Sequence, residues 1–312
     1  MDKLTPLSRM LVDRMAGEND WAELGPVAFR DYLVANRQPP TGEDNIVAQD
    51  VDADGVFVRL YRPAEREDAL PVLVFLHGGG FVSGTVNNYD RLCHRIARRA
   101  ECAVASVEYR LAPEHPYPAA VEDAITALAW VARAGGKHKI DTSRIAIGGD
   151  SAGGTLSIVA SLNSRDSGGP AIRHMMLIYP GLDLASDTES KREFGRGGYM
   201  LDEAFSAMCI GAYTPDSASR AEPNASPLRA ESVAGLPSAT IIVPECDPLR
   251  DDILAFSARL EAAGVPVDTK VYPGVFHGFV STFGILPEAD DALDRATTAL
   301  KAALKPALTP AA

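Results

Sequence analysis

Cysteine is scarce in this sequence of 312 residues, and the 4 cysteines are scattered along it. No two of them form a C-x-x-C pair, the usual spacing in a structural zinc site, so we expect no metal centre of that kind. Such sparse thiols also argue against a disulfide framework and are typical of a protein in a reducing cytosol. The cysteines are Cys93, Cys102, Cys209 and Cys246.

Basic residues and long apolar runs are also in short supply. The chain has 30 Lys and Arg residues against 42 Asp and Glu residues, a net charge of −12. Because an acidic surface repels phosphate backbones and anionic lipids, we expect neither nucleic acid nor a membrane as partner. No apolar run approaches the ~18 residues of a membrane-spanning helix. The N-terminal segment lacks the apolar core of a signal peptide, so we expect a cytoplasmic protein.

The sequence does contain alternating strand-like and helix-like segments. Hydrophobic residues make up 46% of the chain, enough for a sizeable core. Several strand-like runs are continuously apolar, which predicts a mostly parallel, buried sheet built from βαβ units. The expected strands lie at 45–51, 56–63, 71–76, 103–109, 144–149, 174–180, 239–245 and 267–273. The expected helices lie near 88–100, 118–133, 152 onward, 250–263 and 287–304.

Two segments depart from this alternation. Apolar residues recur at helical spacing near the N-terminus, which predicts an amphipathic helix. The stretch 183–235 interrupts the rhythm, and we interpret it as an insertion between two strands. It carries a second apolar series, and the two series either roof an apolar pocket or simply pack on the core. They are Leu4, Leu7, Leu11 and Met15, and Met200, Leu201, Phe205 and Met208.

Residues 149–153, GDSAG, have the pattern G-x-S-x-G. The pattern lies where an expected strand meets an expected helix. A serine on such a turn projects its hydroxyl from a strained backbone, next to a helix N-terminus that favours developing negative charge. The alternative is a serine that caps the helix in a glycine-rich turn. The position between strand and helix favours Ser151 as a nucleophile.

A serine nucleophile needs a base, and the chain has 6 histidines. His277 lies in a turn after an expected strand, at the edge of a parallel sheet where ligands bind. His174 begins an expected strand, so we interpret it as structural. In sheets of this class the order along the chain is serine, acid, histidine, which favours His277 as the base.

The acid should therefore lie between Ser151 and His277, at the end of a strand. Asp247 directly follows the expected strand 239–245 and is the first candidate. Such an acid holds the imidazole in one tautomer and stabilises the imidazolium. Glu245 is a weaker candidate. The two later acids resemble the first-turn acids of a helix and are Asp251 and Asp252.

The segment HGGGFVSG at 77–84 offers bare backbone after another expected strand. Attack on an acyl carbonyl places negative charge on its oxygen, and fixed N–H donors stabilise that charge. We expect Gly79 and Gly80 to supply two donors and Ala152 a third. His77 is expected to brace the loop rather than transfer protons. A phosphate-binding loop is the rival interpretation, but the segment lacks the Lys and Ser/Thr of a P-loop.

Six segments occur in a recognisable order along the chain. They are HGGGF at 77–81, EYRLAPEHPYPAAVED at 108–123, GDSAGG at 149–154, YPGLD at 179–183, DPLRDD at 247–252 and HGF at 277–279. Together they resemble the hormone-sensitive-lipase-like family of α/β-hydrolases, the bacterial family IV esterases. The resemblance implies an α/β-hydrolase fold with an eight-stranded, mostly parallel sheet. It implies one domain over 1–312, with a helical cap formed by about 1–42 and 183–235.

The resemblance also implies a chemistry. Its triad consists of Ser151 as nucleophile, Asp247 as acid and His277 as base, and its oxyanion hole consists of Gly79, Gly80 and Ala152. The implied activity is hydrolysis of short- to medium-chain carboxylic esters through an acyl-enzyme. It requires neither a metal nor a cofactor, and the partner is the small-molecule ester. A homodimer is a further expectation, because the family often dimerises.

Two alternatives stay open on sequence alone. Amides, formamides or lactones need the same nucleophile and oxyanion hole, so the motifs do not separate them from esters. A small-molecule receptor on this fold is the more distant alternative, since fold does not fix function. The plant hormone receptors that this family resembles have lost the catalytic histidine, whereas His277 is present here.

Overall fold

The centre of the molecule is one eight-stranded sheet, seen in a computed structural model that describes residues 2–16, 20–36 and 45–306. Its strands are β1 (Ile46–Ala53), β2 (Val56–Pro63), β3 (Leu70–Leu76), β4 (Ala103–Glu108), β5 (Ile140–Asp150), β6 (Ile172–Ile178), β7 (Ser238–Cys246) and β8 (Val267–Phe276). Their order across the sheet is β1-β2-β4-β3-β5-β6-β7-β8. The pairs β1–β2 and β2–β4 are antiparallel, and the other neighbouring pairs are parallel. The predicted α/β-hydrolase architecture is confirmed.

Burial along the strands follows their position in the sheet. Every residue of the central strand β3 is buried, as its continuous apolar run predicts for a strand covered on both faces. The edge strand β1 is mostly exposed, and its polar residues suit that place. Asp54 and Gly55 join β1 to β2 with φ angles of 58° and 91°. Two positive φ angles are what a tight hairpin turn requires, so β1 and β2 form a hairpin.

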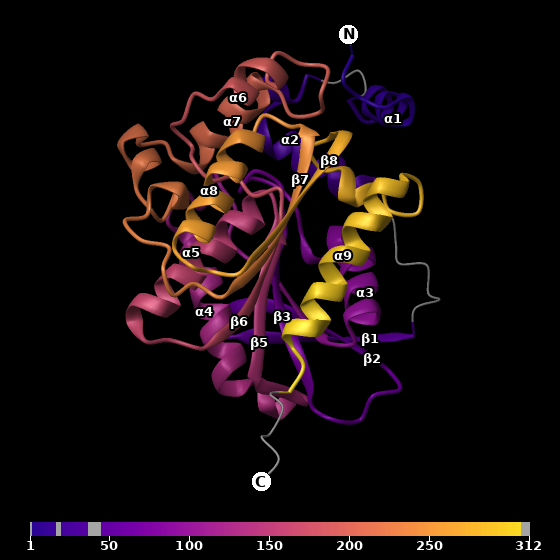
Figure 1. The fold of residues 1–312 in the computed structure, drawn as a ribbon, viewed down its shortest axis with the longest axis vertical. Helices are drawn as coiled ribbons and strands as arrows, with labels where there is room; N and C mark the ends of the chain where they lie inside the picture. The colour runs from indigo at the N-terminus through magenta and orange to yellow at the C-terminus, as the bar shows by residue number, and fades with distance from the viewer. Residues whose placement is uncertain (1, 17–19, 37–44, 307–312) are drawn as a thin grey trace.

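Helices cover both faces of the sheet. The longer ones are α3 (Val86–Ala100), α4 (Ala119–Ala134), α5 (Ala152–Ser167), α8 (Arg250–Ala262) and α9 (Pro287–Ala303). Figure 1 shows α3 and α9 on one side of the sheet and α4, α5 and α8 on the other. The apolar core therefore forms two layers, as expected for βαβ units. Within the described ranges, no helix is long and apolar enough to cross a membrane.

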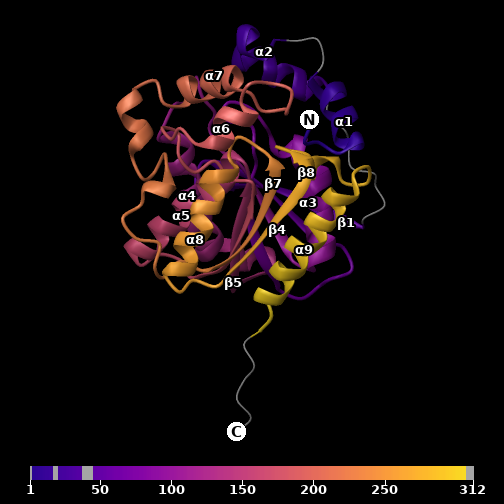
Figure 2. The same ribbon diagram turned by 45° about the horizontal axis from the view of Figure 1, so that its top comes forward.

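Further helices gather at one end of the molecule, as Figure 2 shows. They are α1 (Pro6–Ala16), α2 (Trp21–Ala35), α6 (Glu189–Phe194) and α7 (Glu203–Tyr213). Short 3-10 turns complete the chain at η1 (Gly135–His138), η2 (Ser217–Ala221), η3 (Pro227–Arg229) and η4 (Phe279–Thr282). Of the segment predicted as the N-terminal part of the cap, residues 1, 17–19 and 37–42 lie outside the described residues.

The apolar series predicted at this end of the molecule are shorter than expected. Leu4 precedes α1, which begins at Pro6. Met200 and Leu201 precede α7, because Asp202 caps that helix by accepting the N–H of Phe205 at 2.8 Å. Met200 is 37% exposed, so it does not belong to an inward-facing series. An N-cap residue outweighs apolar spacing in setting where a helix begins.

Candidate active site

Ser151 occupies a sharp turn between β5 and α5. Its φ of 51° and ψ of −119° lie outside the regions that non-glycine residues normally adopt. Such a conformation costs on the order of 1–3 kcal/mol and persists only where the surroundings fix it. Here the N–H of Ser151 donates to the carbonyl of Ile178 at 2.9 Å, and its carbonyl accepts the N–H of Thr155 at 3.1 Å. The turn projects the hydroxyl at the carboxyl edge of the sheet.

The glycines beside Ser151 allow β5 and α5 to approach β3 closely. A Cβ on Gly149 would lie 2.1 Å from the carbonyl oxygen of Leu76, and one on Gly153 would lie 1.9 Å from the same atom. These contacts are with backbone, so no side chain can move aside to relieve them. The G-x-S-x-G pattern is therefore needed here for packing, which explains both glycines.

His277 and Asp247 meet Ser151 at the same edge of the sheet. Asp247 directly follows β7 and His277 directly follows β8, so both lie at carboxyl ends of parallel strands. His277 Nε2 is 2.9 Å from Ser151 Oγ, and His277 Nδ1 is 2.8 Å from Asp247 Oδ2. The Asp247 side chain is fully buried, and its Oδ1 accepts the N–H of Leu249 at 2.8 Å. One carboxylate oxygen is thus held by backbone while the other faces the imidazole.

The competing acids are engaged elsewhere. Glu245 accepts the N–H of Gly274 at 2.8 Å and so is directed at β8. Asp251 accepts the N–H of Ser190 at 2.8 Å. Asp252, nearly fully buried, accepts the hydroxyl of Ser186 at 2.7 Å and pairs with Lys191 Nζ at 3.1 Å. Asp251 and Asp252 lie in the first turn of α8, as predicted. Through Ser190 and Ser186 they also join the insertion to the segment that carries Asp247.

His174 is buried on β6 and has a structural role, as predicted. His174 on β6 lies 2.9 Å from Ser238 Oγ through Nδ1 and 3.1 Å from Thr240 Oγ1 through Nε2. Burial lowers the pKa of His174 to about 4, so its ring is neutral near pH 7. Both ring nitrogens are occupied by hydroxyl groups of β7, so His174 serves the sheet.

The loop after β3 holds its carbonyl groups in fixed directions. The Gly78 carbonyl accepts a hydrogen bond from His77 Nδ1 at 2.8 Å. The Gly79 carbonyl accepts the N–H groups of Val82 and Ser83 at 3.1 and 3.0 Å, and the Ser83 hydroxyl at 2.9 Å. In a trans peptide the following N–H points away from the carbonyl. The N–H groups of Gly79 and Gly80 therefore point away from the donors on His77, Val82 and Ser83 that hold the preceding carbonyls.

These N–H groups are also free. Among the residues that the structure describes, no acceptor takes the N–H of Gly79, Gly80 or Ala152. Gly79 and Gly80 have φ angles of 117° and 62°, which an L side chain rarely adopts. Their arrangement suits donation to a developing oxyanion.

His77 braces this loop from beneath. It is fully buried, stacks on Tyr109 with ring centroids 4.2 Å apart, and its carbonyl accepts the Tyr109 hydroxyl at 2.7 Å. Burial lowers the pKa of His77 to about 4. A neutral ring whose Nδ1–H points at its neighbour's carbonyl is suited to support and not to proton transfer.

Helices α2 and α7 pack against the same loop. A Cβ on Gly80 would lie 2.7 Å from Cys209 Sγ, so the thiol of α7 occupies the space beside that glycine. One turn further on, Tyr213 stacks on Phe81 with centroids 3.8 Å apart. From α2, Arg30 donates to the carbonyl of Val82 at 3.0 Å. The glycine loop is thus held between the sheet and the helices at this end.

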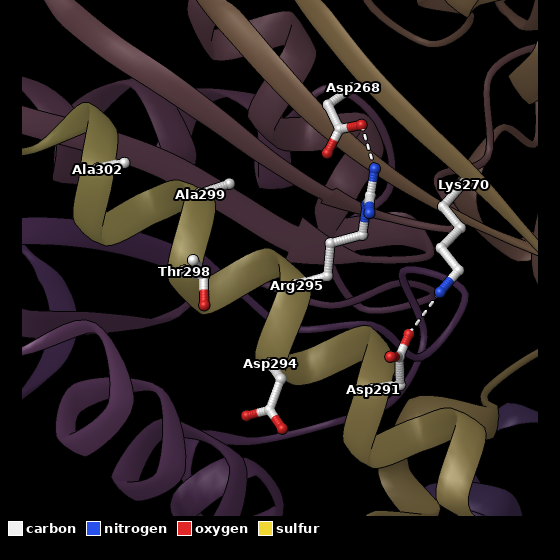
Figure 3. A pocket seen from close by; sticks show the side chains of 8 residues that line it. All are labelled: Asp268, Lys270, Asp291, Asp294, Arg295, Thr298, Ala299 and Ala302. Carbon is white, nitrogen blue, oxygen red and sulfur yellow. Dashed lines mark hydrogen bonds and ion pairs between the residues drawn. The ribbon is translucent and has the colours of Figure 1, made fainter.

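A surface groove of about 420 Å³ lies away from these residues, between β8 and α9 (Figure 3). Four of its charged side chains pair with one another: Lys270 Nζ lies 2.7 Å from Asp291, and Arg295 pairs with Asp268. The fifth, Asp294, pairs with Arg99 outside the groove. The charged side chains that line this groove are thus all held in ion pairs.

Comparison with known proteins agrees with this architecture. A family model described as the alpha/beta hydrolase fold matches residues 73–281. The chain belongs to this family. Over 278 residues this α/β-hydrolase is 41% identical to Esterase LipI of Mycobacterium tuberculosis, covering 86% of this chain and 85% of LipI. It is 37% identical over 310 residues to Carboxylesterase NlhH of the same organism, covering 96% of each.

Solved structures give the same result. A thermostable esterase from Pseudomonas putida superimposes with a TM-score of 0.92 at 30% identity, covering 98% of this chain and 99% of that one. These relatives confirm the resemblance to hormone-sensitive-lipase-like esterases that the motifs indicate.

Two residues around the site, Asp150 and Cys209, were not singled out from sequence as parts of the site. Asp150 contacts Gly78 across 72 positions of sequence, and Cys209 contacts Gly80. For Asp150 the only signal was its place inside the G-x-S-x-G pattern. For Cys209 there was none, because a single apolar position in an amphipathic helix does not reveal what it packs against.

Proposed function

We propose that this α/β-hydrolase is a serine carboxylesterase with Ser151 as nucleophile. The observation that carries the proposal is the continuous chain from Asp247 Oδ2 through His277 to Ser151 Oγ, with distances of 2.8 and 2.9 Å. A serine hydroxyl is a weak nucleophile unless an adjacent base takes its proton. The names of the relatives, esterase and carboxylesterase, support ester hydrolysis as the reaction.

In the proposed acylation, His277 Nε2 takes the proton of Ser151 as Oγ bonds to the ester carbonyl carbon. The carbonyl oxygen becomes an oxyanion and accepts hydrogen bonds from Gly79, Gly80 and Ala152. When the tetrahedral intermediate collapses, the bond to the alcohol oxygen breaks and that oxygen takes the proton from His277. The alcohol leaves, and Ser151 carries the acyl group.

Deacylation repeats these steps with water. His277 takes a proton from water as the water oxygen bonds to the acyl carbon, and the same donors stabilise the second oxyanion. Collapse breaks the bond to Ser151 Oγ, which regains its proton from His277, and the carboxylic acid leaves. The buried carboxylate of Asp247 stabilises the imidazolium in both halves of the cycle.

We further propose that residues 1–42 and 183–235 form a cap over this site. The contacts of Cys209 and Tyr213 with the glycine loop support it, since the same helix that touches Gly80 and Phe81 also covers them. An apolar cover suits esters with short to medium acyl chains, which have little polar surface to hydrate.

The proposal is tested by hydrolysis of p-nitrophenyl acetate and butyrate by Ser151→Ala and a matched control. Ser157→Ala is the control, because Ser157 lies on α5, the helix that follows Ser151, is buried, and donates its hydroxyl to the carbonyl of Gly153 at 2.8 Å. We expect Ser151→Ala to lose activity and Ser157→Ala to keep it. Equal rates for Ser151→Ala and the wild type would exclude Ser151 as nucleophile.

A second assay defines the leaving group. Ethyl butyrate, γ-butyrolactone and butyranilide all present a four-carbon acyl carbonyl, with an alcohol, a tethered alcohol and an amine as the respective leaving groups. We expect the ester to react fastest. In a separate series of p-nitrophenyl esters of increasing acyl length, we expect activity to fall beyond medium chain length. A faster lactone or anilide would replace the ester assignment while leaving the nucleophile in place.

A further inference from the structure

The residue before the proposed nucleophile is a buried carboxylate. Asp150 ends β5 and is 8% exposed. Its Oδ1 accepts the N–H of Gly78 at 2.8 Å, and its Oδ2 accepts the hydroxyl of Tyr89 at 2.9 Å. The Tyr89 oxygen lies 3.0 Å from the same Gly78 nitrogen. Carboxylate, phenol and peptide N–H thus form a closed set of three contacts.

This set leaves no room for a side chain at residue 78. A Cβ on Gly78 would lie 2.4 Å from Asp150 Oδ2 and 2.9 Å from the Tyr89 oxygen. The first glycine of the loop is therefore required by the carboxylate, whereas the next two carry the proposed oxyanion donors. Because Gly78 directly precedes them, the bond to Asp150 fixes where the donor segment begins.

Burying this carboxylate is unfavourable, and the structure retains it. Burial raises the pKa of Asp150 to about 6, although hydrogen bonds from Tyr89 and Gly78 and the charge of His277 each lower it. A neutral residue of the same shape would avoid the cost of burial. Unfavourable groups of this kind concentrate where function requires them.

We propose that Asp150 is a positioning residue for the oxyanion hole, acting through its charge-assisted hydrogen bond from Gly78. The carboxylate holds Gly78, and through it the N–H groups of Gly79 and Gly80, in the geometry that the transition state needs. The inference rests on the proposed function, since it assumes Ser151 and His277 in their catalytic roles.

Groups from several elements face Asp150. The tyrosine and cysteine pKa values among them are all raised by burial, so these side chains stay neutral below pH 9. The groups are Tyr89 and Cys93 from α3, Tyr109 after β4, Tyr179 after β6 and His277 after β8.

The first test is Asp150→Asn, which keeps the shape and removes the charge. With p-nitrophenyl butyrate at pH 8 we expect kcat to fall about 30-fold, less than the 10²–10³ typical of losing an oxyanion donor outright. KM should change by less than about threefold, because the ground-state ester does not use these donors fully. An unchanged kcat would overturn the inference.

The second readout is the pH dependence of the wild-type to Asp150→Asn ratio of kcat/KM. With the pKa of Asp150 at about 6, the carboxylate is nearly fully ionised at pH 8 and about one quarter ionised at pH 5.5. Protonated Asp150 lacks the charge just as Asn does, so the ratio should fall about fourfold across this range. A constant ratio would indicate a role independent of charge and would contradict the inference.

Tyr89→Phe provides an independent variant. It removes a hydrogen bond that lowers the pKa of Asp150, so the acid limb of kcat/KM should move to higher pH. An unmoved limb would count against the proposal even if Asp150→Asn failed to fold. Folding is checked by the thermal midpoint at pH 8, which Asp150→Asn should maintain or raise because a buried charge is removed.

Ser151→Ala is measured in parallel to separate the two proposals. If it keeps activity, the proposed function fails. If it is inactive while Asp150→Asn retains the wild-type kcat, only the role of Asp150 fails.

Discussion

The contact between α7 and the glycine loop can be tested by overfilling it. Gly80 has a φ of 62°, and a Cβ there would lie 2.7 Å from Cys209 Sγ and 3.1 Å from Cys209 Cβ. An L side chain in this left-handed region costs ~1–2 kcal/mol. Overpacking of a buried contact adds ~1–3 kcal/mol. Gly80→Ala should therefore lower the free energy of unfolding by ~2–5 kcal/mol.

Cys209→Ala removes the atom responsible for the closest contact. Alone it should cost about 1 kcal/mol, for the loss of one buried sulfur. In the double variant only the 3.1 Å approach to Cβ remains, which a shift of a few tenths of an ångström relieves. The double variant should then lose ~2–3 kcal/mol, less than the sum of the single losses. The cycle predicts a favourable coupling of ~1–3 kcal/mol.

Gly168 supplies the matched control. Its φ is 66°, but a Cβ there would have no neighbour within 4 Å. Gly168→Ala should cost only the backbone term of ~1–2 kcal/mol and should add simply to Cys209→Ala. Urea unfolding at 25 °C measures the stabilities, and kcat with p-nitrophenyl butyrate should recover partly in the Gly80→Ala, Cys209→Ala double variant. Additive losses for Gly80 and Cys209 would refute the contact.

Three further outcomes are expected. Asp252→Ala removes a nearly fully buried carboxylate that accepts the Ser186 hydroxyl and pairs with Lys191, and it should cost ~3 kcal/mol in urea unfolding. Asp187→Ala, at an exposed pair, should cost under ~1 kcal/mol; similar losses would show that Asp252 does not hold the insertion to α8. Burial lowers the pKa of His174 to about 4 in the folded protein, from an ordinary value of 6.5, so the unfolded chain binds this proton at higher pH. As the pH falls from 6.5 to 4, the free energy of unfolding should therefore fall by up to ~1.4 kcal/mol per pH unit. His174→Asn should lessen this slope, and an unchanged slope would contradict the buried, neutral state of His174. Arg30→Ala should speed amide hydrogen exchange in α2 and leave exchange in α9 unchanged, because α2 loses its bonds to the carbonyls of Val82 and Ala112. Equal exchange of α2 in the wild type and in Arg30→Ala would show that Arg30 does not hold α2.

The sequence alone predicts the sheet, and it predicts that Ser151, Asp247 and His277 lie at one edge of that sheet because each follows a parallel strand. Parallel strands place their carboxyl ends at one edge, so the residues that follow β5, β7 and β8 are predicted to lie at the same edge. The strand order β5-β6-β7-β8, which brings the three residues close together along that edge, comes from the structure.

Other features of the site depend on packing that periodicity does not encode. Cys209 lies beside Gly80 because of how α7 is placed over the sheet. The apolar spacing of the insertion does not predict which of its side chains takes that position. Met200 was assigned to an inward series, but the Asp202 cap begins the helix after it. The bond from Asp150 to Gly78 joins two motifs that each had a sufficient explanation on its own.

The central claim is that Ser151 is the activated nucleophile, and a fluorophosphonate tests it most directly. Such a reagent forms a stable bond only with a serine whose proton is taken by a base. Peptide mapping of the wild type should find one adduct per chain on Ser151, none on Ser151→Ala, and much slower labelling of His277→Ala. Labelling of a different residue, or none in an enzyme that still hydrolyses esters, would contradict the account.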